Sequence, residues 1–147
     1  MTRFLTIIVA LLASASINAS EVKNVKSIGQ NQSVNECIKK YKSNNIECLD
    51  DIIDKSESLL NKTYNDKLNE IKKSDLNTVW MGDEKQKEYA IGLFIENQKK
   101  WIDYRGNYCT VALWKVQNSQ HLGENQTSCK LNMNKRRIEE INLIGFE

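Results

Sequence analysis

The stretch Q-K-K-W-I-D-Y-R-G-N-Y-C, Gln98–Cys109, decides how the rest of the chain is interpreted. It places three aromatic residues, an arginine and a cysteine within little more than three helical turns. Aromatic residues make up only 7% of the chain, so this density indicates the centre of a core or a recognition surface. A guanidinium stays protonated and cannot perform acid–base catalysis, and no nucleophile–base pair accompanies Arg105. The stretch therefore predicts packing or recognition rather than bond-breaking chemistry.

Apolar residues recur every three or four positions along two long segments, which predicts two amphipathic helices. The first is Ile46–Lys73, and the second runs from Asp83 to about Val116 and contains Gln98–Cys109. Two such stripes need each other as partners, so we expect Trp101 and Tyr108 to pack against the first helix. Gly92 lies in the middle of the second helix and is interpreted as a point of close helix–helix approach.

Shorter helices are expected at both ends of the chain. Ser33 and Glu36 form a capping box that predicts a helix from Ser33 to Lys42. A final helix is predicted at about Thr127–Leu143, after a polar loop at Gln117–Gln126. The expected fold is all-α, a disulfide-stapled helical bundle built on two long antiparallel helices with a short helix at each end.

Composition agrees with a helical protein of one domain. The 147 residues include no proline and only six glycines, which favours long helices over a turn-rich sheet. Lys and Arg number 21 against 19 Asp and Glu, a formal net charge of +2. Because the charges are interspersed, no polybasic stripe is present, and we expect no nucleic-acid partner.

The N-terminus has the outline of a secretory leader, residues 1–19. Arg3 supplies the positive region, Phe4–Leu12 is an uninterrupted apolar run, and Ala13–Ala19 is a small-residue tail with a plausible cleavage site near Ala19. A retained membrane anchor is the alternative, although the uncharged stretch is short for a span. We expect a flexible lead-in at 20–32, a single domain at 33–147, and a periplasmic or secreted protein with no stable membrane anchor after cleavage.

Because extracytoplasmic compartments are oxidising, the four cysteines of an exported protein are interpreted as two disulfides. Three pairings of Cys37, Cys48, Cys109 and Cys129 are possible. Pairing of sequence neighbours, Cys37–Cys48 and Cys109–Cys129, closes the shortest loops and is favoured. A zinc site is the alternative, but it lacks a CxxC spacing and has only one histidine to draw on, His121.

The sequence offers no recognisable catalytic arrangement. Asp50-Asp51 and Glu139-Glu140 are adjacent pairs, so their side chains point in different directions on a helix. His121 is interpreted as a solvated residue of a loop. We therefore predict no enzyme activity, no metal and no cofactor.

The order and spacing of several residues resemble the family named after the lysozyme inhibitor LprI. The matching residues are Leu60-Asn61-x-x-Tyr64-x-x-x-Leu68, then Gln98-x-x-Trp101-x-x-Tyr104-Arg105-x-x-x-Cys109, then Gly123, and Cys129-x-x-x-Met133-x-x-x-Arg137-x-x-x-Ile141. The resemblance covers about Cys37–Leu143. Its motif core is Asn61, Tyr64, Gln98, Trp101, Tyr104, Arg105 and Arg137.

The resemblance implies a small helical protein outside the cytoplasm that inhibits a cell-wall hydrolase, with lysozyme as the first candidate. Two positions depart from the family pattern: Gly106 replaces the acid that usually follows the arginine, and the loop before Cys129 has one glycine where the family often has two. Without that acid, a buried Arg105 needs acceptors from elsewhere, for example helix-end carbonyls.

Two functions remain open at this point. The first is inhibition of lysozyme, and the alternative is an envelope interaction module or an immunity protein against a secreted toxin. Five acids could attract a cationic enzyme but are interpreted as a solvated face: Glu47, Asp50, Asp51, Asp54 and Glu57. The apolar segment Val79–Trp80–Met81 caps the bundle in one interpretation and contacts a partner in the other. The sequence does not locate the partner-binding surface.

Overall fold

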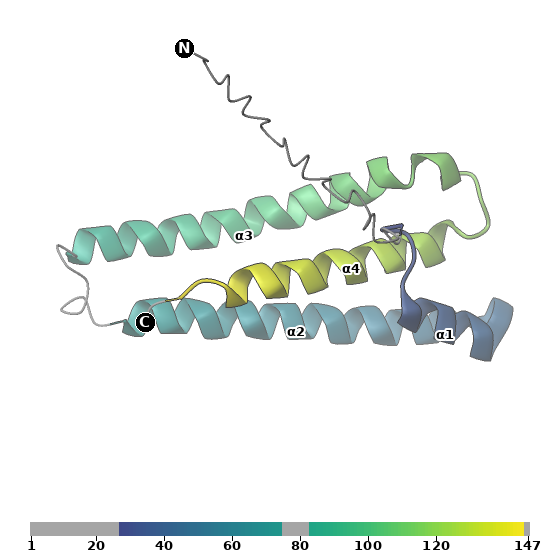
Figure 1. Cartoon of the computed structure of the whole chain (residues 1–147), viewed down its shortest axis with the longest axis horizontal. Coiled ribbons are helices and arrows are strands. Elements are labelled where there is room, and N and C mark those ends of the chain that lie inside the picture. Colours follow the sequence, from purple (N-terminus) through teal and green to yellow (C-terminus); the bar gives the residue numbers. More distant parts are fainter. Residues whose placement is uncertain (1–26, 75–82, 146–147) are drawn as a thin grey trace, which may run out of the picture.

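The computed structural model describes residues 27–74 and 83–145, and within these ranges the elements are helical (Figure 1). In chain order they are α1 (Gln32–Tyr41), the 3-10 turn η1 (Lys42–Asn44), α2 (Ile46–Lys73), α3 (Glu84–Ala112), the 3-10 turn η3 (Trp114–Val116) and α4 (Leu122–Asn142). The all-α, disulfide-stapled class predicted from the sequence is confirmed. The predicted leader, 1–19, and the segment Val79–Met81 lie outside the described residues.

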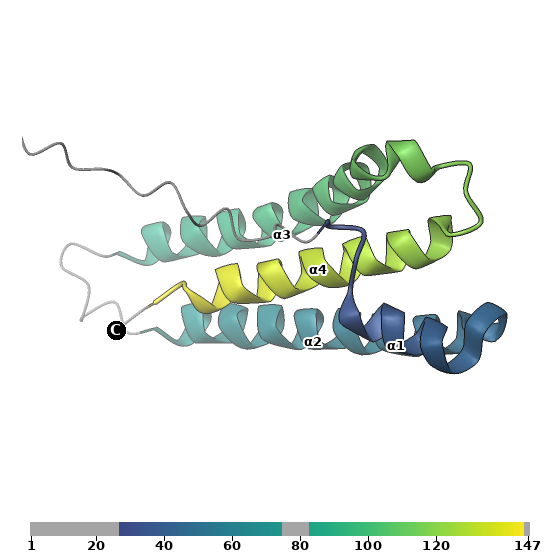
Figure 2. The ribbon, with the colours of Figure 1, turned by 45° about the vertical axis from the view of Figure 1, so that its right-hand side comes forward.

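The three long helices lie side by side, with α4 between α2 and α3 (Figures 1 and 2). Both α2 and α4 run in the same direction, and α3 runs opposite to them. Side-chain hydrogen bonds fix the alignment of α2 and α4: Asn45 bonds Glu124 near one end, and Ser56 bonds Asn134 near the middle. These partners are 79 and 78 residues apart, so the offset stays nearly constant along the pair.

The last helix is longer and more central than the sequence indicated. It begins at Leu122, whereas residues up to Gln126 were predicted to form a loop. The first turn is polar and is held by hydrogen bonds instead of apolar packing: the Asn125 side chain donates to the carbonyl of His121, and Glu124 accepts from Asn45. The helix was predicted from apolar periodicity, which does not detect a polar first turn.

The other helix ends follow local capping chemistry. The bounds of α2 agree with the predicted Ile46–Lys73. Asp83 caps α3 as expected, since its side chain accepts from the Gln86 amide at 2.8 Å. The predicted capping box at Ser33 is wrong, because Asn31 is the N-cap of α1 and accepts from the Ser33 amide at 2.9 Å. Helix α3 ends at Ala112 and continues as the turn η3 instead of reaching Val116 as α-helix.

The core consists of three clusters of buried apolar side chains. At the α2 C-terminal end they are Leu60, Ile71, Phe94 and Ile141; between α3 and α4 they are Cys109, Leu113, Cys129 and Met133; beside α1 they are Val34, Cys37 and Leu49. Trp101 packs against both the first and the second cluster. Tyr108 packs against the second cluster, on α4, and the expectation that it lies on the α2 stripe is wrong because α4 occupies that position.

Both disulfides of the favoured pairing are present. Cys37–Cys48 joins α1 to α2 with a Cα–Cα distance of 5.7 Å, and Cys109–Cys129 joins α3 to α4 at 5.8 Å. Each peripheral helix is thus tied to one member of the α2–α4 pair.

The described part of the lead-in, residues 27–31, lies against α4. The Asn132 side chain donates to the carbonyls of Ile28 and Gln30 at 2.9 and 2.8 Å. A Cβ at Gly29 would lie 2.9 Å from side-chain atoms of Asn125 and Leu113, so this glycine allows a close approach. The close approach expected at Gly92 is wrong, since open space surrounds that position.

None of the helices in the two described ranges is long and apolar enough to cross a bilayer.

Candidate functional site

Arg105 lies at the centre of a polar layer that separates the two apolar clusters around Trp101. Its Nη1 donates to Glu57 Oε1 on α2 at 2.5 Å and also to Asn134 Oδ1 on α4. The Arg105 side chain is only 12% exposed, so these acceptors compensate a guanidinium that has lost most of its water. The acceptors are therefore side chains from two neighbouring helices, and the expectation of helix-end carbonyls is wrong.

Asn134 completes this layer, although sequence reasoning did not select it. It is fully buried, and its Nδ2 donates to Ser56 Oγ at 3.0 Å and to Glu57 Oε1 at 3.2 Å. The sequence spacing could have identified it: Asn134 lies four residues before Ile138 and seven before Ile141, so it falls on the apolar face of α4. A polar residue on that face predicts a buried hydrogen-bond partner.

A second arginine reaches the same region from α4. The Arg137 Nε donates to Oε1 of the buried Gln98 at 3.0 Å, and its Nη1 pairs with Glu140 at 3.0 Å. The guanidinium carbons of Arg105 and Arg137 lie 5.3 and 5.6 Å from the Trp101 ring centroid. Both distances are within the range of cation–π attraction, so Trp101 interacts with two cations.

Two other residues of the family motif lie along α2 and differ in their surroundings. Tyr64 stacks on Phe94 of α3 with ring centroids 5.1 Å apart and an interplanar angle of 10°. Burial removes water from the hydroxyl and raises the pKa of Tyr64 above its ordinary value. Asn61 is exposed on the outer face of α2 and does not join the polar layer.

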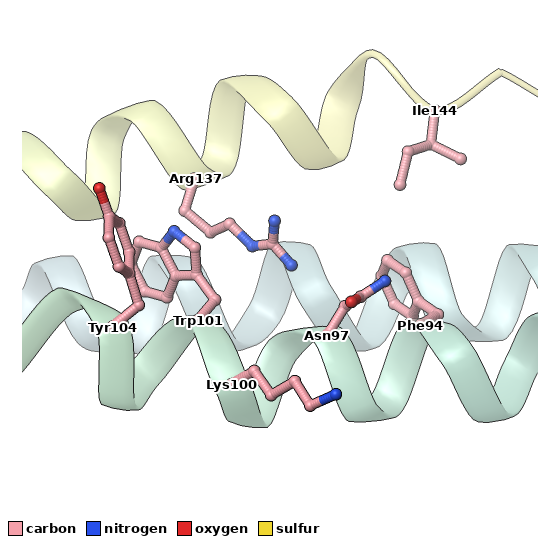
Figure 3. Close-up of a pocket in the computed structure, with 7 residues that line it drawn as sticks. All are labelled: Phe94, Asn97, Lys100, Trp101, Tyr104, Arg137 and Ile144. Carbon is pink, nitrogen blue, oxygen red and sulfur yellow. The ribbon is translucent and has the colours of Figure 1, made fainter.

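An open hollow of about 370 Å³ borders the polar layer between α3 and α4 (Figure 3). Its lining residues are Phe94, Asn97, Lys100, Trp101, Tyr104, Arg137 and Ile144. Figure 3 shows the Arg137 side chain reaching from α4 towards α3 beside the Trp101 ring, with Tyr104 on the other side of that ring. The Tyr104 side is accessible, since this residue is 52% exposed and tilts against Tyr108 with centroids 5.7 Å apart.

The cations of this hollow already have partners. Lys100 pairs with Glu96 at 2.7 Å, and this hydrogen-bonded contact lowers the pKa of Glu96 below its ordinary value. Arg137 pairs with Glu140 and Gln98, as described above. The motif residues Gln98, Trp101, Arg105 and Arg137 therefore meet in one place, where Arg105 and the Arg137–Gln98 pair join three helices, and Tyr104 lies at the exposed edge of this group.

The described residues contain no group of three side chains suited to hold a metal ion. His121 precedes α4, and its Nδ1 lies 2.8 Å from Glu124 Oε2. All four cysteines are in disulfides, so no thiol is free. Within residues 27–74 and 83–145, His121 hydrogen-bonds the side chains of Gln120 and Glu124 and does not contact a hydroxyl or thiol in this way.

Comparison with known protein families gives a match over most of the chain. Residues 30–141 match the family model described as lysozyme inhibitor LprI, which spans all four α-helices except the last residue of α4. No curated protein and no solved structure matches the chain.

Proposed function

The chain belongs to the lysozyme inhibitor LprI family, and from this membership we propose that it binds and inhibits a lysozyme-type cell-wall hydrolase. The observation that carries the proposal is the family match over residues 30–141. The family description names an inhibitor, so the proposed activity is binding and not catalysis. Residues 33–147 form the single domain that binds the enzyme.

The proposal places the protein in the periplasm or outside the cell. Residues 1–19 are the leader that directs export, with cleavage near Ala19. Two disulfides support this location, since such bonds form and persist in oxidising compartments. Cell-wall hydrolases act in the same compartments, and exported inhibitor and enzyme therefore meet there.

Electrostatic attraction to a cationic lysozyme has to be local. Arg3 is the only charged residue of the leader, so its removal leaves a net charge of +1 that gives no long-range attraction. Four acids of the predicted cluster, Glu47, Asp50, Asp51 and Asp54, are exposed on the first half of α2. Glu57 does not belong to this surface, because it turns inward to Arg105.

A lysis assay tests the proposal directly. The protein is expressed from its full sequence, purified from the periplasm or medium, and added to lysozyme acting on bacterial cell walls. We expect dose-dependent slowing of lysis at micromolar inhibitor or below. Absence of slowing with lysozymes of several structural types would refute inhibition, and a pull-down from envelope extract would then test the interaction-module alternative.

A further inference from the structure

We propose that the end of α1 and the turn that leads from it to α2, residues 39–46, enter the substrate cleft of the inhibited hydrolase and pair their lysines with carboxylates there. This inference rests on the proposed function and assigns a surface to it. We call these residues the α1–α2 corner. The turn that joins α1 to α2 lies at one end of the long axis of the molecule in both views (Figures 1 and 2).

The corner is held rigidly from both sides. The Cys37–Cys48 disulfide closes it across 11 positions of sequence, so its two flanking helices cannot separate. The side chain of the buried Asn45 donates to Glu124 Oε1 on α4 at 2.7 Å and anchors the base of the turn. A segment that is ordered before binding loses less conformational entropy when it binds, which favours tight inhibition.

The backbone of the corner adopts an unfavourable conformation at a lysine. Lys42 has φ 51° and ψ −120°, and it is the one non-glycine residue with positive φ in the described ranges. Glycine adopts this region without steric cost, whereas a lysine does so only when its surroundings impose it. Strained residues of this kind are often found at binding sites. Here the strained residue is Lys42, so a long cationic side chain stands on the turn.

The surface of the corner combines apolar and cationic groups. Tyr41 and Ile46 are 43% and 68% exposed, large fractions for apolar side chains next to a disulfide. Lys39, Lys40 and Lys42 are also exposed, and none of the ion pairs recorded for the described residues involves them. Lys40 Nζ lies 4.8 Å from the Tyr41 ring centroid and so adds a cation to the aromatic face.

This chemistry complements the active site of a glycan hydrolase. Cleavage of a glycosidic bond uses two carboxyl groups that face each other across an open cleft. A cleft lined by one sign of charge focuses its field on an incoming group of the opposite sign. Lys39 and Lys42 have no ion pair to break on entering such a cleft, and the apolar surface of Tyr41 and Ile46 supplies contact area around them.

The hollow of Figure 3 fits the same partner less well. Its cations Lys100 and Arg137 are already paired with Glu96 and Glu140, and those pairs would have to break. Lys42 and Ile46 also border a hollow, of about 520 Å³, so the difference between the two surfaces lies in charge, and the unpaired charge favours the α1–α2 corner.

The test measures binding to an animal-type lysozyme by calorimetry, with inhibition of lysis in parallel. Lys42→Glu and Ile46→Asp should each weaken binding about tenfold or more, because each places a negative charge against the carboxylates of the cleft. Lys42→Gly removes the side chain and relieves the backbone, so it should weaken binding while the protein melts no lower than the parent. Lys72→Glu, an exposed charge reversal at the far end of α2, is the matched control and should bind like the parent.

A short N-acetylglucosamine oligomer should compete with the protein, because both occupy the cleft. If the parent binds and inhibits lysozyme while the corner variants do so equally well, the corner assignment is overturned and the proposed function stands. Loss of binding in Tyr104→Ala, with the corner variants unaffected, would overturn it in favour of the hollow. If the parent itself neither binds nor inhibits any lysozyme, the proposed function falls and the corner assignment falls with it.

Discussion

Replacing Arg105 by alanine removes the centre of the polar layer and should destabilise the fold strongly. The substitution leaves Asn134 fully buried with an unpaired oxygen, and it leaves Glu57 beside the core without its cation. Breaking a buried ion pair costs roughly 3–5 kcal/mol. Glu57 is 33% exposed and regains some water, so we expect a loss of about 3 kcal/mol, at the lower end of that range. For a domain of this size that loss corresponds to a melting temperature lower by about 12 °C.

Thermal unfolding followed by circular dichroism measures the effect, and a double-mutant cycle identifies its source. Glu57→Ala and the double variant should show a coupling of about 1–2 kcal/mol between the two side chains. Arg136→Ala is the matched control, since Arg136 is an exposed arginine of α4 and should change stability by about 0.5 kcal/mol or less. An unchanged melting temperature in Arg105→Ala, together with lost lysozyme binding, would contradict the structural role and make Arg105 a recognition residue.

Other substitutions test the remaining features. Replacing Cys109 and Cys129 by serine should lower the free energy of unfolding by about 3 kcal/mol in denaturant titrations, because the open loop regains its entropy; equal stability would contradict a structural bond. Gly106→Ala should raise the free energy of unfolding by about 0.5–1 kcal/mol, since the site is helical and surrounded by open space. Gly29→Ala should lower it by about 1–3 kcal/mol through collision with neighbouring side chains, so the two glycine variants should differ in sign. Burial raises the pKa of Tyr64. The stability that its neutral hydroxyl contributes to the fold is therefore complete below the ordinary pKa of 10.0 and is lost as pH rises through the pKa of the folded state. Tyr64→Phe should accordingly lose less stability than the parent between pH 8 and pH 11.

The helices could be predicted from the sequence where apolar spacing and caps agree. Ile46–Lys73 has both a long apolar stripe and a polar outer face, and its bounds match those of α2. Asp83 caps α3 because a short acceptor at that position reaches the Gln86 amide. The start of α4 at Leu122 was missed, since its first turn depends on a hydrogen bond from Asn125 to the His121 carbonyl and on one from the distant Asn45, neither of which apolar spacing reveals.

The site was only partly predictable for the same reason. Trp101 and Arg105 stood out because aromatic and guanidinium side chains are few and strongly constrained when buried. Glu57 was interpreted as part of a solvated acidic face together with Glu47, Asp50, Asp51 and Asp54, and the structure shows the other four exposed. Only the rotation of α2 about its axis decides that Glu57 faces inward, and that rotation depends on the packing of the whole bundle.

The parallel arrangement of α2 and α4 has a consequence for how the chain folds. The hydrogen bonds that align the pair join residues 77 to 79 positions apart, so neither helix finds its main partner until most of the chain has been made. Closing so long a loop costs more entropy than closing a hairpin, and proteins with many distant contacts fold more slowly. The Cys109–Cys129 bond spans only 20 positions and can form within the α3–α4 hairpin first. Once this bond has formed, α4 can approach α2 in only a limited set of orientations. Disulfide formation would then guide folding as well as stabilise the folded protein.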